Sequence, residues 1–215
     1  MTHTVFITGG TGYIGSRLID ALLERGHTVR ALARRTSLER LSTGCTVATG
    51  DALDHSTYAN QITPADTFVH LVGARSPGPW DKEKFRDVDL TSAREAIAAA
   101  LESGIHHFIY ISVAHPAPMM ADYISARLEA EALLRKSGMK TTILQPWYVL
   151  GPGRRWPLVL LPLYWLARLV PPARAAARRL GLVTITQMIA ALVDAVQHPP
   201  ANVRILTVPD IRGFR

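Results

Sequence analysis

The chain has a single cysteine, Cys45, among its 215 residues. One thiol cannot form an internal disulfide and has no cysteine partner for a metal site, so we expect neither a disulfide framework nor a metal centre. The sequence also opens without a charged region followed by a long apolar stretch, because Met1-Thr2-His3 leads directly into a strand pattern. Together these absences predict a protein of the reducing cytoplasm.

No apolar run is long and unbroken enough to span a bilayer. The most hydrophobic segment, residues 156–170, is interrupted by Pro157, Pro162 and Arg168. Its tryptophans, tyrosine and leucines beside arginines suit a membrane interface or the groove of a partner protein. A lid buried over a ligand or a dimer contact explains the same composition, and we favour it, with peripheral membrane or protein contact through residues 156–170 as the alternative.

Acidic residues are missing from residues 132–193, which hold nine Lys and Arg residues, whereas the remainder holds 15 basic and 17 acidic residues. This asymmetry indicates an anionic ligand, an anionic membrane surface or a solvated basic face. No run of Lys and Arg interleaved with aromatic residues and no nucleic-acid-binding motif occurs. Nucleic acid is therefore not an expected partner.

What the sequence does have is a glycine-rich turn between a strand and a helix pattern. Thr8-Gly9-Gly10-Thr11-Gly12-Tyr13-Ile14-Gly15 follows the apolar run Val5-Phe6-Ile7. Gly9 permits a tight turn, Gly12 lets backbone N–H groups approach a pyrophosphate, and Gly15 lets the helix pack closely. The helix N-terminus adds partial positive charge. We therefore predict a dinucleotide-binding turn whose contacts include Thr11, Tyr13 and Ile14.

Strand and helix patterns alternate along the chain, which predicts an α/β, Rossmann-type doubly wound parallel sheet with a short C-terminal helical appendage. Residues 1–153 are expected to form the NAD(P)-binding domain, and residues 154–215 a small segment packed on the same domain. That segment should end in a helix over 181–197, capped by Thr184 or Thr186. The other expected strands cover 28–33, 46–49, 67–72, 107–112 and 141–144, and the other expected helices cover 87–102 and 123–136.

The end of the second predicted strand, Leu32-Ala33-Arg34-Arg35, contains no carboxylate. In Rossmann-type folds an acidic residue there binds the ribose hydroxyls of NAD, whereas an arginine accommodates the extra phosphate of NADP. We therefore predict that NADP(H) is preferred over NAD(H), with Arg34 as chief phosphate ligand and Arg35 as auxiliary; solvated loop arginines are the competing interpretation. Asp51, beside Ala52, is expected to accept a hydrogen bond from the adenine amino group, or simply to form a turn.

Three polar residues predict proton transfer at the next strand end. Ser112 ends the strand expected over 107–112, and Tyr123 and Arg127 share a helix face. A phenol titrates near about 10, so proton exchange near neutrality needs a nearby cation and a hydrogen-bonding hydroxyl. We predict that Ser112 positions a carbonyl oxygen, Tyr123 exchanges its proton, and Arg127 holds the ribose and lowers the tyrosine's pKa. His115, in the intervening loop, is an alternative acid or base, or a surface residue.

At these residues the chain resembles the short-chain dehydrogenase/reductase superfamily, in its atypical and extended branch with epimerase/dehydratase-like or NmrA-like members. The resemblance covers about residues 4–153 and implies NAD(P) binding, a small-molecule substrate and dimerisation through helices on one face of the sheet. It also implies that Leu71, Val72 and Gly73, and Pro146, Trp147 and Tyr148, border the cofactor. The matching motifs are Thr8-Gly9-x-x-Gly12-x-x-Gly15, Gly50-Asp51, Tyr110-Ile111-Ser112, Tyr123-x-x-x-Arg127-x-x-x-Glu131 and residues 145–153, Gln-Pro-Trp-Tyr-Val-Leu-Gly-Pro-Gly.

The sequence departs from the family pattern in three places: Arg127 replaces a lysine, Asp89 replaces an asparagine, and Gln145 replaces an arginine. An arginine stays charged and bonds ribose hydroxyls, but it does not relay a proton as a lysine does. The expected function is NADP(H)-dependent hydride transfer to or from a small carbonyl, enone or quinone-like substrate. The alternative is a non-catalytic NADP-binding regulator or subunit that binds a partner or membrane surface.

Overall fold

The computed structural model describes residues 1–74, 85–117, 120–154, 158–159, 175–176 and 179–215. Within them, seven strands form one sheet in the order β3-β2-β1-β4-β5-β6-β9, with every neighbouring pair parallel. In that order the strands are Thr46–Thr49, Thr28–Ala33, Thr4–Thr8, Thr67–His70, His107–Ile111, Lys140–Gln145 and Val203–Thr207. Outside this sheet, β7 (Tyr148–Leu150) pairs with β8 (Leu182–Thr184).

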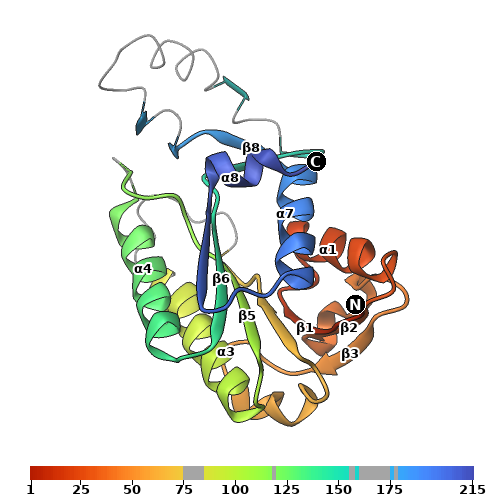
Figure 1. Cartoon of the computed structure of the whole chain (residues 1–215). Coiled ribbons are helices and arrows are strands. Elements are labelled where there is room, and N and C mark those ends of the chain that lie inside the picture. Colours follow the sequence, from red (N-terminus) through yellow and green to blue (C-terminus); the bar gives the residue numbers. More distant parts are fainter. Residues whose placement is uncertain (75–84, 118–119, 155–157, 160–174, 177–178) are drawn as a thin grey trace.

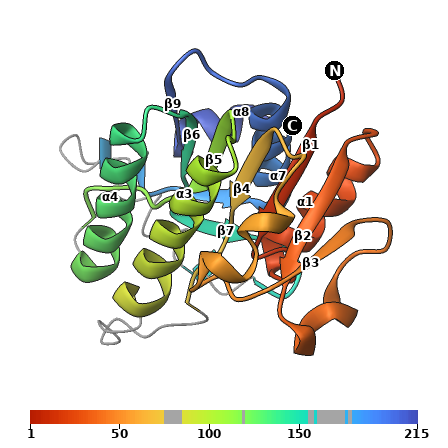
Figure 2. The ribbon, with the colours of Figure 1, turned by 90° about the horizontal axis from the view of Figure 1, so that it is seen from below.

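Helices cover both faces of the sheet (Figures 1 and 2). The longer ones are α1 (Tyr13–Leu23), α3 (Thr91–Glu102), α4 (Ala121–Lys136) and α7 (Ile185–Gln197), and α8 (Val208–Gly213) follows β9. The short 3₁₀-helical turns are η1 (Arg35–Arg40), η2 (His55–Thr57) and η3 (Ala59–Gln61). A π-helical turn, η4 (Phe85–Leu90), leads into α3.

Alternation along the strands divides the buried apolar residues into two cores. In β1, Val5 and Ile7 pack in one core with α1 and α7, whereas Phe6 packs in the other with α3 and α4. Successive side chains of a strand point to opposite faces, so a strand buried on both faces is apolar throughout. This explains the continuous run Val5-Phe6-Ile7, and the layered sheet confirms the predicted Rossmann-type fold.

The strand order reverses direction at β1. From β1 the chain moves outward to β2 and β3, and then returns to β4 on the other side. Loops leaving β1 and β4 therefore diverge, which opens a crevice at the carboxyl ends of these strands. The glycine-rich turn after β1 and the segment after β4 both lie at this crevice.

The C-terminal part differs from the sequence prediction. β9 was not predicted, yet it adds a parallel strand beside β6 in the main sheet, so this part is not only helical. The predicted helix over 181–197 begins only at Ile185, because Leu182–Thr184 forms β8. Thr184 is its N-cap, accepting a hydrogen bond from the Gln187 N–H at 3.2 Å.

The membrane-or-partner segment, residues 156–170, lies outside the described residues except for Leu158 and Val159, which are both exposed. Among the residues that the structure describes, no helix has both the length and the apolar composition needed to cross a bilayer.

Candidate functional site

Gly9, Gly12 and Gly15, in the turn after β1, differ in how much space a side chain would have. Gly9 has φ +77°, and a Cβ there would lie 2.8 Å from the Leu71 carbonyl carbon. A Cβ on Gly15 would lie 2.3 Å from the Gly9 carbonyl oxygen, so this position also excludes a side chain. A Cβ on Gly12 would approach only the Gly9 oxygen, at 3.1 Å. The protein itself thus requires Gly9 and Gly15, whereas Gly12 keeps a backbone face open for a ligand.

The N-terminus of α1 lies directly behind that open face. No acidic residue lies in the first turn of α1, and no side chain caps it at Gly12. The first N–H groups of a helix have no partner within the helix, and the aligned peptide dipoles make this end partly positive. The turn therefore offers unneutralised donors, as an anionic group requires.

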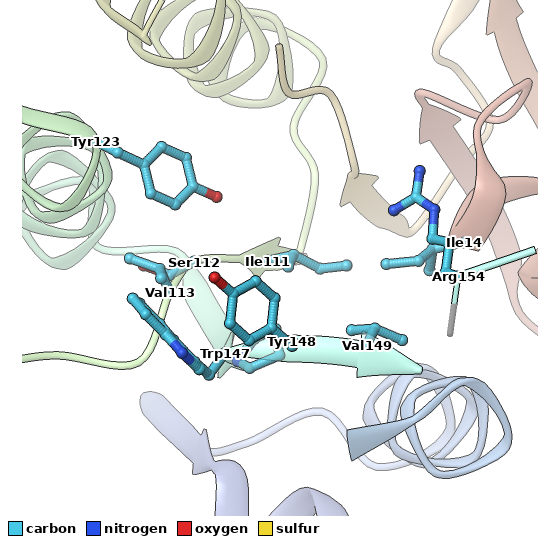
Figure 3. A pocket seen from close by; sticks show the side chains of 10 residues that line it. Ile14, Ile111, Ser112, Val113, Tyr123, Trp147, Tyr148, Val149 and Arg154 are labelled. Atoms are coloured by element: carbon cyan, nitrogen blue, oxygen red, sulfur yellow. The ribbon is translucent and has the colours of Figure 1, made fainter. Parts of the chain in front are cut away.

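A cavity of about 300 Å³ lies at the carboxyl ends of the central strands, beside this turn (Figure 3). It brings together six of the predicted site residues: Ile14, Ser112, Tyr123, Pro146, Trp147 and Tyr148. The remaining lining residues, Ile111, Val113, Val149 and Arg154, were not predicted. Ile111 and Val113 flank Ser112, and Val149 directly follows Tyr148. Their position beside predicted residues is the signal that would have identified them.

Ser112 is the most unusual polar group of this cavity. The residue is 3% exposed, and its backbone N–H donates to the Leu144 carbonyl at 2.7 Å. Its Oγ atom is buried, and no hydrogen-bond partner for it occurs among the described residues. A buried hydroxyl without a partner is costly, by roughly 1–3 kcal/mol. This hydroxyl is therefore available to a ligand in the cavity.

Tyr123 approaches the cavity from the first turns of α4, and its hydroxyl points inward across from Tyr148 (Figure 3). Phe85 fixes its ring from one side, with 5.0 Å between ring centroids. The Arg127 guanidinium carbon lies 5.2 Å from the centroid of the same ring. Tyr148 itself is half-buried, and burial raises the pKa of its phenol, so this group stays protonated at neutral pH.

Arg127 does not line the cavity; it is buried beneath it. Its Nη2 atom pairs with the carboxylate of Asp89, in η4, and its Nη1 atom donates to the Ile111 carbonyl at 2.9 Å. Asp89 also accepts a hydrogen bond from the Ala74 N–H at 3.1 Å. A Cβ on Gly73 would lie 2.8 Å from Nη2, so this glycine makes room for the pair. Arg127 and Asp89, two of the three departures from the family pattern, thus form one buried ion pair.

The predicted adenosine-side residues lie outside the cavity. Arg34, directly after β2, and Arg35 are both exposed. A third arginine of this loop, Arg40, was missed by the sequence analysis; its Nη2 atom lies 3.4 Å from the Thr11 carbonyl oxygen. Asp51 is exposed, and its Oδ1 atom accepts the Leu53 N–H at 3.0 Å, which is the turn-forming alternative.

Other predicted contacts support the turn or the core. Ala52 packs against the core on the α3 and α4 face. The Leu71 N–H donates to the Thr8 carbonyl at 3.0 Å, and Leu71 and Val72 lie against Gly9. These residues therefore shape the crevice through their backbone.

His115 belongs to a separate polar cluster. Its Nε2 atom lies 3.1 Å from the Gln145 amide nitrogen, which donates to Glu131 at 2.9 Å. Glu131 is 3% exposed and is also 3.5 Å from Arg135. This cluster joins the loop after β5 to α4 and β6. Gln145, the third departure from the family pattern, is therefore hydrogen-bonded to the buried carboxylate of Glu131.

Residues 9–154 match the NAD(P)H-binding family. The chain belongs to this family. This match and the likeness to epimerases in sequence and fold support the resemblance that its motifs carry, an atypical member of the short-chain dehydrogenase/reductase superfamily.

Two curated relatives resemble it over nearly its whole length. It is 28% identical to the ceramide reductase of Caulobacter vibrioides, over 97% of this chain and 65% of the relative. It is 25% identical to the UDP-glucose 4-epimerase of Vibrio cholerae, over 98% of this chain and 71% of the relative. The chain thus spans less than two thirds of the ceramide reductase.

Among solved structures, the Bordetella bronchiseptica enzyme WbmH in complex with NAD⁺ has a TM-score of 0.72 to this chain. Sequence identity is 22%, over 96% of this chain and 76% of that one. The likeness shows that the fold is shared.

Proposed function

We propose that this chain is an NADP(H)-dependent oxidoreductase that transfers hydride to or from a small carbonyl, enone or quinone-like substrate. The observation that carries the proposal is the Ser112 hydroxyl, buried and without a partner among the described residues, in one cavity with the Tyr123 hydroxyl. Two hydroxyls converging on a cavity at the carboxyl ends of the strands suit a carbonyl oxygen. Membership of the NAD(P)H-binding family supports the cofactor class.

The residues present fit a dinucleotide. The open backbone face at Gly12 and the uncapped α1 N-terminus suit a diphosphate, and the apolar wall formed by Ile14, Ile111 and Val149 suits a flat ring. When bound, the nicotinamide ring would supply or accept the hydride.

The protein's own part is positioning and proton transfer. The Ser112 hydroxyl would donate a hydrogen bond to the substrate carbonyl oxygen, and the Tyr123 hydroxyl would give its proton to that oxygen during reduction. The Arg127 guanidinium lies against the Tyr123 ring, but it is already paired with Asp89. Arg127 would therefore act from beneath the site, through the position of Tyr123, rather than by relaying a proton.

Changing Tyr123 to Phe should reduce kcat by about 100-fold or more while leaving cofactor affinity within about twofold, because only the proton-exchanging hydroxyl is removed. Steady-state kinetics against a carbonyl and quinone panel, with calorimetric titration of NADPH, measures both quantities. The matched control is Tyr148→Phe, which removes a second phenol from the same cavity. Equal losses in both variants would contradict the special role of Tyr123.

Changing Arg34 to Ala should raise the Kd of NADPH at least tenfold and leave that of NADH nearly unchanged, because an arginine at the end of β2 would contact only the extra phosphate. Arg35→Ala is the matched control, with a smaller effect expected from the auxiliary residue. Equal weakening for both cofactors would refute this assignment of the phosphate site.

One observation favours the second candidate function, a non-catalytic NADP-binding regulator or subunit: the charge of Arg127 is taken up by Asp89. Calorimetric titration of NADPH, NADP, NADH and NAD, followed by the substrate panel, separates the candidates. Tight binding with turnover supports the oxidoreductase, and tight binding without turnover supports the regulator. No binding at all would refute both.

A further inference from the structure

Arg154 is a charged residue of the cavity that the proposed hydride transfer does not use. It follows β7 at the turn 151–154, and it lines the cavity beside Ile14 of the first turn of α1. Figure 3 shows it opposite Ser112 and Tyr123, across the cavity. Its side chain therefore lies at the end where the glycine-rich turn meets the cavity.

Contacts with Tyr13 hold Arg154 in this place. The Arg154 guanidinium carbon lies 4.5 Å from the centroid of the Tyr13 ring, a cation–π distance. The Tyr13 hydroxyl lies so close to Gly151 that a Cβ there would be 2.0 Å from it. The Arg154 N–H donates to the Gly151 carbonyl at 2.9 Å, which closes the turn. The turn 151–154 is thereby docked on the first residue of α1.

Arg154 is an exposed, positively charged residue of the cavity lining. Among the described residues, no carboxylate forms an ion pair with it. The first turn of α1 holds no acidic residue either, so a guanidinium faces the partly positive end of a helix. Since Arg154 is exposed, water screens its charge in the free protein, and an anion bound between the two positive groups would be attracted by both.

A second, independent feature of the same cavity suits a ligand. Ser112, at its other end, is 97% buried, and its Oγ atom has no partner among the described residues. The cavity thus has the buried Ser112 hydroxyl at one end and the Arg154 guanidinium at the other. A dinucleotide has a matching polarity, because its diphosphate carries negative charge, whereas its flat nicotinamide ring carries none and would lie nearer Ser112.

We propose that Arg154 donates hydrogen bonds to the diphosphate of the bound dinucleotide and raises the affinity for NADP(H) and NAD(H) alike. The inference rests on the proposed function, since it needs a bound dinucleotide. It differs from the assignment of Arg34, which concerns the extra phosphate of NADP alone. Arg154 is therefore a binding residue for both cofactors and not a determinant of choice between them.

Arg154→Gln tests this by calorimetric titration of NADPH and NADH at low and at high salt. A charged hydrogen bond to phosphate predicts a Kd about tenfold or more higher for both cofactors, and a weaker salt dependence than in the unchanged protein. Arg154→Lys should recover part of the loss, because it restores the charge without the planar fork.

Arg17→Gln is the matched control. The Arg17 guanidinium carbon lies 4.2 Å from the same Tyr13 ring, and its Nη1 atom donates to the Tyr13 carbonyl at 2.8 Å, but Arg17 does not line the cavity. We expect its Kd values to stay within about twofold. Thermal unfolding of each variant shows whether the fold is retained.

An unchanged Kd in Arg154→Gln, or a loss no larger than that of Arg17→Gln, would overturn the inference. A loss confined to NADPH would also overturn it, because Arg154 would then contact the extra phosphate. Failure of the proposed function is distinguishable, because it is read in the unchanged protein. Binding without turnover there would refute the oxidoreductase alone, whereas no binding of either cofactor would refute this inference as well.

Discussion

Changing Arg127 to Met should lower the free energy of unfolding by about 3–5 kcal/mol, because it leaves the Asp89 carboxylate buried without its counter-charge. Asp89 is 1% exposed, and in the described part of the chain its carboxylate keeps one backbone hydrogen-bond donor, the Ala74 N–H. Since domains of this size are commonly stable by about 5–15 kcal/mol, the variant should unfold at a much lower urea concentration. Urea unfolding at pH 7 measures the loss.

A surface pair provides the control for this prediction. Arg94 pairs with Glu129 on the outside of α3 and α4, with side chains 51% and 37% exposed. Exposed ion pairs contribute little, so Arg94→Met should cost less than about 1 kcal/mol. Similar losses in Arg94→Met and Arg127→Met would mean that the buried pair is not a special element of the fold.

A double variant separates the charge from the packing. Asp89→Asn combined with Arg127→Met removes both charges, and an asparagine side chain still accepts the Ala74 N–H. We expect it to be more stable than Arg127→Met alone, because no unpaired charge stays buried. If the double variant is instead as unstable as the sum of its single changes, the two residues do not act as a pair.

The glycine-rich turn and the convergence of Ser112 and Tyr123 could be predicted from the sequence, because both follow from local patterns. A strand, a glycine turn and a helix specify their own geometry. Residues at the carboxyl ends of parallel strands must meet at one edge of the sheet. Ile14 from the glycine-rich turn, Ser112 from a strand end and Tyr123 from the following helix accordingly line one cavity.

The Asp89–Arg127 pair could not be predicted in the same way. The two residues are 38 positions apart, on η4 and α4, and each was noted only as a separate departure from the family pattern. Neither helical periodicity nor strand alternation relates them, because their contact depends on how two elements pack beneath the sheet edge. Arg154 was missed for a similar reason, since its position depends on the docking of the turn 151–154 on Tyr13.

β9 is a different case, since its local signal was present. Val203–Thr207, with the sequence Val-Arg-Ile-Leu-Thr, is rich in strand-forming residues and follows a helix closed by a Pro-Pro pair. The strand is nevertheless missing from the prediction, in which the C-terminal part is a helical appendage. Its parallel pairing with β6 extends the sheet and places α8 directly after it.

Acid should destabilise the protein well above the pH at which carboxylates titrate, because burial lowers the pKa values of three histidines, His27, His70 and His107, and most strongly those of the last two. Burial lowers the pKa of His70 to about 3 and that of His107 to about 4. In the unfolded chain a histidine titrates near about 6.5. Between these values the unfolded state binds protons that the folded state does not, so stability falls as the pH falls below about 6.5 and is unaffected by these groups above it.

Each such histidine contributes a slope of about 1.4 kcal/mol per pH unit, so the pair should cost about 3–4 kcal/mol between pH 6.5 and 5. His55 acts in a different range. Its hydrogen bonds to Glu95 and Glu102 raise its pKa, so its stabilisation is complete below about pH 6.5 and is lost as the pH rises through the raised value. Chemical unfolding at closely spaced pH values therefore resolves the two effects.

The double variant His70→Gln, His107→Gln should flatten the acid limb of this stability profile, whatever its stability at neutral pH. The two imidazoles lie in hydrogen-bond contact with hydroxyls, His70 with Thr8 at 2.8 Å and His107 with Thr142 at 2.9 Å. His106→Gln is the matched control, because this neighbouring histidine is exposed and should leave the slope unchanged. An acid limb equally steep in both variants would show that these two buried histidines are not its cause. Carboxylates such as Asp66, whose pKa is lowered by its hydrogen bonds against the opposing effect of burial, lose their stabilisation only at lower pH, near and below about 4.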